Sequence, residues 1–554
     1  MPLDGVVPFP EEFAARYRQE GYWRDRALRE EFDDVFDRYA DRLAVISGEQ
    51  RISYSQVKEG SERLALNLLE LGLRPLDRVV VTLPNVPAFV YLYFALQKIG
   101  AIPICALPSH RYHEIRQFVT LADAVACAVP DRIGDFDFPG LIERIKAEAP
   151  RLKWCLASGE PPHGCVSLAE LLAKEPKLGA GELQGIRIEP TDPAVFQLSG
   201  GTTGIPKLIP RTHNDYFYNS TIAIEVNKPR EGDVLLGVLP IEHNLPLACP
   251  GLQGFLIRGL TVVLSTTSRP ADVFRLIQEH KVTHLEVVPA LLIRWINDPA
   301  TKQFDLSSVR VIQSGGQRFQ PEIRRQTQEV FPNGMVQENF GMSEGLLMFV
   351  RLDDPEEVRM ETSGRPLSPD DEVKLLDDDD NEVPNGEVGE LTVRGPYTLR
   401  GYFRAPEHNA RAFTSDGFYR SGDLMRMHPS GNYIVEGRKK DLINRGGEKI
   451  SAEEIENLIL MHPAVQNVAC VPMPDPVLGE KMCAYVILRR GVPGLTLPQL
   501  VDFLLQQEMA KHKLPERLEI VPEFPLSPFG KVSKKALTER IANVILSEAK
   551  DLPR

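Results

Sequence analysis

The sequence lacks several features that would quickly assign it to a class. None of its seven cysteines forms a C-x-x-C pair, so it suggests neither a zinc site nor a disulfide framework and fits a reducing compartment. Its longest clearly apolar run, 88–96, is too short to cross a bilayer. Its first residues have neither the basic nor the apolar stretch of a signal peptide. We therefore expect a cytoplasmic protein with no membrane partner.

Acidic residues outnumber basic ones, 77 to 64. The formal net charge is −13 and no basic run offsets it, which argues against a nucleic-acid partner. No G-x-G-x-x-G follows an early strand, which disfavours a nicotinamide dehydrogenase. The remaining composition, 43% hydrophobic and 25% charged, is ordinary for a globular protein.

The chain does contain a repeated alternation of strand-like and helix-like patterns. Its 554 residues are too many for one core, so we expect a large unit of about two subdomains and a smaller one. Short apolar runs typical of buried strands alternate with stretches whose apolar residues recur at helical spacing. This alternation predicts α/β layers with largely parallel sheets. These strands are expected within 77–85, 233–240, 260–265 and 283–289.

Two later segments have their own patterns. The acidic run 376–395 is expected to be a turn followed by an exposed strand. From about residue 440 the alternation restarts, which predicts a small α/β unit with its own core. Ser451 and Glu454 have the spacing of a capping box at the start of its first helix.

The segment "LSGGTTGIPKLIPRTH" (198–213) is the clearest candidate for an anion site. Glycines let backbone N–H groups curl around an anion, hydroxyls add donors and a lysine adds charge. The adjacent Gly-Lys-Ser/Thr ending of a Walker A loop is missing, and a flexible turn is the plain alternative. The candidate binding residues are Ser199, Gly200, Gly201, Thr202, Thr203 and Lys207.

This segment resembles the phosphate loop of the acyl- and aryl-adenylate-forming enzymes. Four further motifs of that family follow in order and span almost the whole chain: "NFGMSEG" (339–345), "YRSGD" (419–423), "GRKKDLINRGGEKI" (437–450) and "SPFGKVSKK" (527–535). The resemblance implies a large N-terminal domain of layered α/β subdomains with a β-barrel-like subdomain, and a small mobile α/β C-terminal domain. The implied boundaries are 1–437 for the domain that binds ATP and acid, 438–441 for a hinge, and 442–554 for the mobile domain.

The implied reaction is attack of a carboxylate on the α-phosphate of ATP. Both reactants are anions, so the protein must supply cations and oriented donors. The resemblance makes Lys531 the catalytic lysine, Glu344 a catalytic residue and Mg²⁺ ligand, and Lys440 the hinge residue. The other implied ATP-binding residues are Gly315, Gly316, Phe340, Gly341, Ser343, Asp423 and Arg438. Taken singly, each has a plainer interpretation as a solvated charge, a turn residue or a core aromatic.

"IEHNLPLACPG" (241–251) resembles the specificity motif of the stand-alone aryl-acid adenylating enzymes, which activate salicylate or 2,3-dihydroxybenzoate. The resemblance places catalytic His243 between ring and nucleotide, Asn244 at the 2-hydroxyl and Cys249 against ring carbon 3. Cysteine is a poor hydrogen-bond partner. Together with the bulky Leu347, it favours salicylate over 2,3-dihydroxybenzoate.

Two pocket positions depart from the family pattern. Leu245 replaces an aromatic residue, and Asn339 replaces a small apolar residue. A buried asparagine needs partners, so Asn339 leaves a related 2-hydroxyaryl or heteroaryl acid open.

The implied acceptor of the aryl group is the phosphopantetheine thiol of an aryl carrier protein, as in siderophore biosynthesis. An aryl-CoA ligase that uses CoA shares every adenylation residue and stays open. A catalytically inactive nucleotide- or aryl-binding protein is disfavoured, because Lys207, Glu344, Asp423 and Lys531 are all present.

Overall fold

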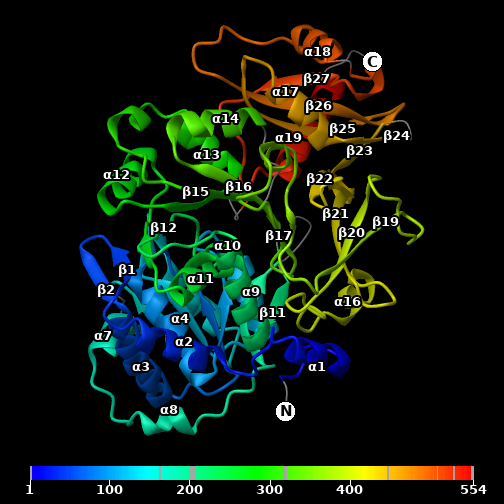
Figure 1. Cartoon of the computed structure of the whole chain (residues 1–554). Coiled ribbons are helices and arrows are strands. Elements are labelled where there is room, and N and C mark those ends of the chain that lie inside the picture. Colours follow the sequence, from blue (N-terminus) through cyan, green and yellow to red (C-terminus); the bar gives the residue numbers. More distant parts are fainter. Residues whose placement is uncertain are drawn as a thin grey trace.

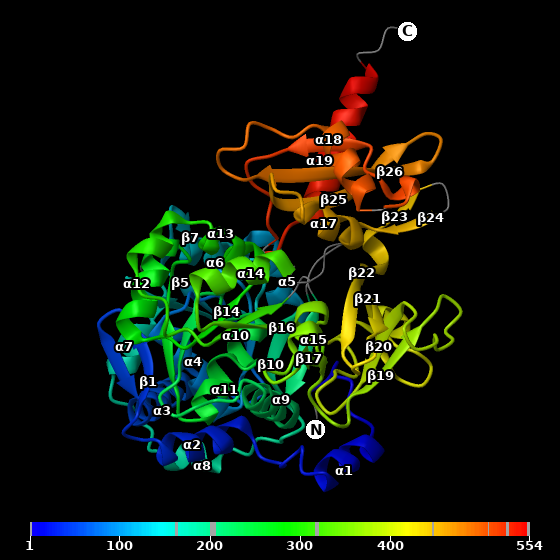
Figure 2. The same cartoon turned by 45° about the horizontal axis from the view of Figure 1, so that its top comes forward.

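The computed structural model describes residues 3–160, 164–199, 207–315, 321–445, 448–507, 509–527 and 531–550. Figures 1 and 2 show a large blue-to-green part, a yellow sheet beside it, and an orange-to-red part across one end. The large part contains two extended sheets.

The first sheet has seven strands in the order β11-β10-β4-β3-β5-β8-β9. All neighbours are parallel except β10 and β11. The strands are β3 (Arg78–Val81), β4 (Ile102–Cys105), β5 (Ala126–Pro130), β8 (Trp154–Ser158), β9 (Val166–Ser167), β10 (Pro193–Leu198) and β11 (Leu208–Thr212). The helices between them are α3 (Tyr54–Leu71), α4 (Pro87–Ile99), α5 (Tyr112–Ala122), α6 (Phe138–Lys146), α7 (Leu168–Ala173) and α8 (Gly181–Gly185). A small hairpin pairs β6 (Arg132–Ile133) with β7 (Phe136–Asp137).

The second sheet has nine strands in the order β18-β17-β16-β15-β14-β12-β13-β1-β2. The run from β16 to β1 is parallel, and both edges are antiparallel. Its strands are β1 (Leu43–Ser47), β2 (Gln50–Ser53), β12 (Val234–Gly237), β13 (Thr261–Leu264), β14 (His284–Val287), β15 (Val311–Gly315), β16 (Met335–Gly341), β17 (Leu347–Phe349) and β18 (Arg365–Pro366). The strands expected near 77–85, 233–240, 260–265 and 283–289 are confirmed as β3, β12, β13 and β14.

Further helices accompany this sheet and the N-terminal segment. They are α1 (Glu11–Gln19), α2 (Leu28–Arg38), α9 (His213–Glu225), α10 (Asn244–Ala248), α11 (Gly251–Ile257), α12 (Pro270–His280), α13 (Pro289–Ile296), η1 (Pro299–Gln303), α14 (Pro321–Val330) and α15 (Glu356–Glu361). One apolar core joins α2, α3, α4, α9 and α11, and it reaches the pocket residues Cys249 and Leu347. The pocket residues Cys249 and Leu347 are therefore held by a packed apolar core.

The yellow sheet is antiparallel, in the order β19-β20-β21-β22. Its strands are β19 (Glu372–Leu376), β20 (Gly389–Arg394), β21 (Tyr419–Met427) and β22 (Tyr433–Arg438), with α16 (Pro406–Ala412) before β21. It is the antiparallel part of residues 1–437, for which the resemblance implied a β-barrel-like subdomain. The expectation of an exposed strand after the acidic run was wrong, because β20 lies between β19 and β21 and all its residues but Arg394 are buried.

The C-terminal part has a separate sheet and separate apolar clusters. Its elements are η2 (Lys439–Asp441), β23 (Leu442–Arg445), β24 (Glu448–Ser451), α17 (Ala452–Leu460), β25 (Val465–Asp475), β26 (Gly479–Leu488), α18 (Leu497–Gln506), η3 (Lys511–Lys513), β27 (Arg517–Ile520) and α19 (Lys534–Lys550). Ser451 caps α17 as expected, because its side chain accepts a hydrogen bond from the Glu454 N–H.

Across the described residues, no helix combines the length and the apolar character that spanning a bilayer requires.

Candidate active site

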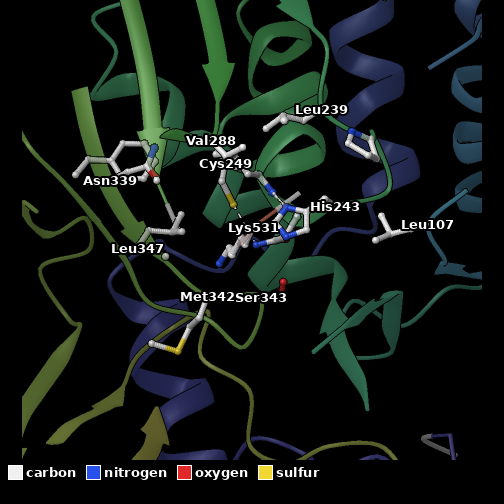
Figure 3. A pocket seen from close by; sticks show the side chains of 16 residues that line it. Leu107, Leu239, His243, Cys249, Val288, Asn339, Met342, Ser343, Leu347 and Lys531 are labelled. Carbon is white, nitrogen blue, oxygen red and sulfur yellow. Dashed lines mark hydrogen bonds between the residues drawn. The ribbon is translucent and has the colours of Figure 1, made fainter. Parts of the chain in front are cut away.

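A pocket lies where β14, β15 and β16 end, and α10 closes one of its sides. The carboxyl ends of parallel strands are the usual place for ligands in α/β sheets. The pocket holds about 690 Å³ of empty space, part of it open to solvent. Its lining comprises Leu107, Leu239, Pro240, His243, Asn244, Leu245, Cys249, Val288, Gly315, Asn339, Gly341, Met342, Ser343, Leu347, Phe349 and Lys531 (Figure 3).

All six residues predicted for the aryl-acid pocket line this cavity: His243, Asn244, Leu245, Cys249, Asn339 and Leu347. They come from α10, β16 and β17 and the residues flanking these elements. Ser343, Gly315, Gly341 and Lys531, which were predicted for nucleotide binding or catalysis, share the lining.

His243 begins α10. Its backbone is extended, and its Nδ1 accepts a hydrogen bond from the Leu245 N–H at 3.4 Å. Burial, and to a lesser extent the positive charge of Lys531, lowers the pKa of His243 to about 4. The imidazole is therefore neutral at pH 7, so it adds no cation to the pocket.

Asn244 is held in a chain of hydrogen bonds beneath the pocket. Its Oδ1 accepts from the Tyr216 hydroxyl at 2.9 Å, and the Tyr216 oxygen accepts from Gln197 Nε2 at 3.0 Å. Its Nδ2 donates to Cys249 Sγ at 3.2 Å. Asn219 Nδ2 donates to the same sulfur at 3.4 Å. Cys249 thus positions Asn244 as well as lining the pocket.

In Figure 3, Asn339 and Leu347 lie on the side of the pocket away from His243. Asn339 pairs with Gly315 of β15 and with Phe349 of β17. A methyl group added to Gly315 would lie 1.8 Å from Asn339 Oδ1, so only glycine leaves room for this side chain. The Nδ2 of Asn339 is buried and has no hydrogen-bond partner among the described residues.

Lys531 reaches the pocket from the C-terminal part, and Figure 3 shows it beside His243. Its backbone is fixed by Ser527: the Lys531 N–H donates to Ser527 Oγ at 3.2 Å, and the Ser527 N–H donates to the Lys531 carbonyl at 2.6 Å. The structure therefore brings the predicted catalytic lysine to the predicted acid pocket.

The two described ends of the Gly-rich segment face each other. The Ser199 N–H donates to the Lys207 carbonyl at 3.0 Å, and the Lys207 N–H donates to Ser199 Oγ at 2.9 Å. The predicted residues Gly200, Gly201, Thr202, Thr203 and Gly316 lie outside the described residues.

Glu344 is buried beside a pair of tyrosines. The Tyr402 hydroxyl donates to Glu344 Oε1 at 2.8 Å and lies 2.9 Å from the Tyr419 hydroxyl. Burial raises the pKa of Glu344, while the Tyr402 hydrogen bond opposes the rise. Lys207 Nζ lies 5.6 Å from the Tyr402 ring centroid. Tyr402 therefore links the end of the Gly-rich segment to Glu344.

Asp423 and Arg438 pair directly across β21 and β22. Arg438 Nε donates to Asp423 Oδ1 at 2.8 Å. Phe340, between the pocket residues Asn339 and Gly341, alternates to the other face of β16 and packs against the apolar cluster that contains Tyr402 and Tyr419. Asp423, Arg438 and Phe340 do not line the acid pocket.

The motifs did not identify the partners of the predicted residues. Tyr216 belongs to the segment "RTHNDY" (211–216), and Tyr402 belongs to "RGPYTLRGY" (394–402). Neither segment is among the motifs from which the site was predicted. Leu107, Leu239, Pro240, Val288, Met342 and Phe349 were missed as lining residues, because apolar side chains carry no motif of their own.

Comparison with known proteins places this geometry in a family. The AMP-binding enzyme profile matches residues 32–403, and the AMP-binding enzyme C-terminal domain matches 454–531. A salicylyl-CoA synthase / salicylate adenylyltransferase of Streptomyces sp is 46% identical, over 97% of this chain and 98% of that protein. The 2,3-dihydroxybenzoate-AMP ligase of Bacillus subtilis (strain 168) is 44% identical, over 98% and 99%.

The solved structures agree. The apo structure of MbtA from Mycobacterium smegmatis is 40% identical, with a TM-score of 0.74 over 97% of this chain and 99% of that one. The expected adenylate-forming fold, with a large N-terminal α/β domain and a small C-terminal domain, is confirmed. The chain belongs to the AMP-binding, adenylate-forming enzymes and, within them, is an ATP-dependent aryl-acid–AMP ligase.

Proposed function

We propose that this enzyme activates a 2-hydroxyaryl acid, salicylate in preference to 2,3-dihydroxybenzoate, and passes the aryl group to the phosphopantetheine thiol of an aryl carrier protein, as in siderophore biosynthesis. One observation carries the proposal: Asn244 and Lys531 line the same pocket. An amide suited to the ring hydroxyl thus lies beside a cation suited to the reacting anions.

In the first half-reaction, a carboxylate oxygen attacks the α-phosphorus of ATP, a P–O bond forms, and the bond to pyrophosphate breaks. Lys531 bridges the carboxylate and the α-phosphate and offsets their mutual repulsion. His243, neutral at pH 7 because its pKa is about 4, packs between ring and nucleotide without adding charge.

The nucleotide occupies the surface next to the acid pocket. Ser199 and Lys207, with Gly200, Gly201, Thr202 and Thr203, hold its phosphates. Gly315, Gly316, Phe340, Gly341 and Ser343 border its adenine, and Asp423 with Arg438 holds the ribose. The existing hydrogen bond from Arg438 to Asp423 Oδ1 orients that carboxylate, so that Oδ2 is available to accept from the ribose.

Glu344 is the residue that would hold Mg²⁺. Mg²⁺ in such sites is usually bound by one or two carboxylates together with substrate phosphates. Glu344 fits this, since it is a carboxylate whose Oε1 is held by the Tyr402 hydroxyl. The bound ion would neutralise phosphate charge. Tyr402 keeps the carboxylate in place.

In the second half-reaction, a thiol sulfur attacks the acyl carbon, the thioester forms and AMP leaves. Lys531 must then withdraw, which we assign to rotation of 442–554 about the hinge at 438–441. The short helix η2, Lys439–Asp441, lies at this point of the chain.

The preference for salicylate follows from the surroundings of Cys249 and Leu347. The Cys249 sulfur already accepts from Asn244 and Asn219, and burial raises the pKa of its thiol to about 12. A 3-hydroxyl placed against this sulfur and Leu347 would lose its water partners, a cost of about 1–3 kcal/mol. About 10²-fold discrimination is a reasonable ceiling for such a pocket.

The test is kcat/KM for salicylate, 2,3-dihydroxybenzoate and benzoate in ATP–pyrophosphate exchange. Wild type should prefer salicylate and use benzoate poorly, because benzoate leaves Asn244 without its ring hydroxyl. Cys249→Ser combined with Leu347→Val should recover 2,3-dihydroxybenzoate, since a serine can accept from both asparagines and still donate its own hydrogen. Equal use of the two acids by wild type, or an unchanged ratio in the double variant, would contradict the preference.

CoA is the alternative acceptor, and one observation favours it: the Streptomyces relative is named a salicylyl-CoA synthase as well as an adenylyltransferase. Parallel assays of thioester formation with CoA and with a phosphopantetheinylated aryl carrier protein separate the two. A kcat/KM at least tenfold higher with the carrier protein is the expected result. The reverse order would make the enzyme an aryl-CoA ligase.

A further inference from the structure

The acid pocket contains a hydrogen-bond donor that neither the 2-hydroxyl nor the carboxylate of the acid explains. Asn339 is 7% exposed, and its Nδ2 is buried with no partner among the described residues. A buried amide without a partner costs stability, and native proteins rarely leave one unless water or a ligand satisfies it. Its place in the pocket lining points to the ligand.

Among the described residues, no side chain accepts a hydrogen bond from Asn339 Nδ2. Val288, Leu347 and Phe349, which also line the pocket, are apolar. The Cys249 sulfur is already engaged by Asn244 and Asn219. The tight contact with Gly315 holds Oδ1 toward β15.

The sheet beneath Asn339 is polar as well. Glu286, Gln313 and Gln337 are in register across β14, β15 and β16, on the face that carries Val288, Gly315 and Asn339. Among the described residues, each has one buried atom without a partner: Glu286 Oε2, Gln313 Nε2 and Gln337 Oε1. Of this polar group, Asn339 is the member that lines the pocket. Its Nδ2 is therefore the donor through which this group can meet a polar ring edge or ordered water in the pocket.

We propose that Asn339 is a specificity-determining residue that selects an aryl acid with a hydrogen-bond acceptor, such as an ether oxygen or a ring nitrogen, on the ring edge facing β16. The inference rests on the proposed activation of 2-hydroxyaryl acids and narrows it. Nδ2 donates to the acceptor, so an acid that lacks one leaves the amide unpaired. Such a loss is typically worth about tenfold in kcat/KM.

The test uses matched acids in ATP–pyrophosphate exchange: 4- and 5-methoxysalicylate against 4- and 5-ethylsalicylate, and 3-hydroxypicolinate against salicylate. Methoxy and ethyl groups have the same number of heavy atoms, so their ratio isolates the acceptor. Wild type should favour at least one acceptor-bearing acid by about tenfold. Asn339→Leu, similar in size but without a donor, should bring that ratio to about one.

Two further variants test whether the Asn339 donor, rather than the shape of the pocket, sets the preference. Asn339→Asp keeps the shape but replaces the donor with a carboxylate, so it should also lose the preference. Leu347→Val, on the same wall, should change the rates but keep the ratio. The inference would be overturned, and the proposed function left standing, by either of two results. One is a kcat/KM ratio near one for every pair of acids in wild type, and the other is a preference that survives in both Asn339 variants. Failure of every 2-hydroxyaryl acid to support exchange would overturn the proposed function and the inference with it.

Discussion

At the scale of single residues, the account depends on one cation that arrives from the C-terminal part of the chain. Burial and the nearby Lys531 charge keep His243 neutral, so the lysine faces the reacting anions without help from the imidazole. Its backbone is fixed through both hydrogen bonds to Ser527, which limits where the ammonium can go.

Lys531→Ala should reduce adenylation by about 10²-fold or more, because a transition-state contact between two anions is lost. ATP–pyrophosphate exchange measures this step. Thiol transfer from supplied aryl-adenylate should stay close to wild type. Lys535→Ala is the matched control, since Lys535 is an exposed lysine four residues further on. Near-normal exchange in Lys531→Ala would remove this role from the residue.

Tyr402→Phe should weaken the use of ATP without altering the choice of acid. The variant removes the hydrogen bond to Glu344 Oε1 but keeps the ring near Lys207. We expect KM for ATP–Mg²⁺ to rise by about tenfold or more, because losing a residue that orients a metal ligand typically costs about 10- to 100-fold. The salicylate to 2,3-dihydroxybenzoate ratio should be unchanged. A shift in that ratio with no change in KM for ATP would contradict this role.

Which residues meet in the pocket was predictable, but their hydrogen bonds were not. His243, Asn244 and Cys249 were found through a motif, and all three line the cavity. The same motif could not show that Cys249 accepts from Asn244, or that Tyr216 supports Asn244 from α9, because these contacts depend on packing between distant segments. Asn339 stood out in the sequence as a departure from the family pattern, and only the fold shows that its Nδ2 lacks a partner.

At the scale of elements, buried strands with clear apolar runs were predictable, whereas exposure was not. β12 and β14 were expected from their composition and are present. β20 was expected to be exposed because an acidic run precedes it. It is instead an inner strand, and burial of a strand is set by its neighbours β19 and β21 rather than by the charge of the preceding turn.

The short helix η2 is the element on which domain rotation would depend. Lys440→Pro should separate the half-reactions, because proline fixes φ at a position that must change its backbone angles. Adenylation, measured by pyrophosphate exchange, should persist while thioester formation falls sharply. Lys440→Ala, which leaves φ free, is the control and should retain both steps. Equal losses of both steps in the proline variant would place the hinge elsewhere.

The junction of α2 and α9 makes stability depend on pH. The Leu28 N–H at the start of α2 donates to His213 Nδ1 at 3.2 Å, and burial lowers the pKa of His213 to about 3. An unfolded histidine has a pKa of about 6.5. The neutral form therefore stabilises the fold above pH 6.5, and this contribution is lost as the pH falls toward 3, by at most about 1.4 kcal/mol per pH unit.

His213→Asn should flatten part of that acid dependence, since its side-chain oxygen accepts from Leu28 but does not become protonated in this range. Chemical denaturation between pH 4 and 7 gives the free energy of unfolding of wild type and variant. Other buried histidines, His110 and His284 among them, will keep some dependence. His113→Asn, at an exposed site, should match wild type. An unchanged slope in His213→Asn would show that His213 does not cause it.

At the scale of the whole molecule, the acid pocket belongs to the large part of the chain and the proposed catalytic lysine to the small one. Residues from 243 to 349 line most of the cavity, and Lys531 completes it from beyond the proposed hinge. Figures 1 and 2 show the orange-to-red part lying across the end of the large part where β15 and β16 terminate. This arrangement is the one that the proposed adenylation step requires, because it brings Lys531 to the acid pocket.

ATP–pyrophosphate exchange by the full chain, with salicylate as the acid and benzoate as the comparison, tests the central claim most directly. The account predicts exchange that depends on the acid, with kcat/KM for salicylate higher than for benzoate by about tenfold or more, because benzoate lacks the 2-hydroxyl that we propose Asn244 binds. No exchange with salicylate or its ring-substituted relatives, or equal exchange with benzoate, would contradict it.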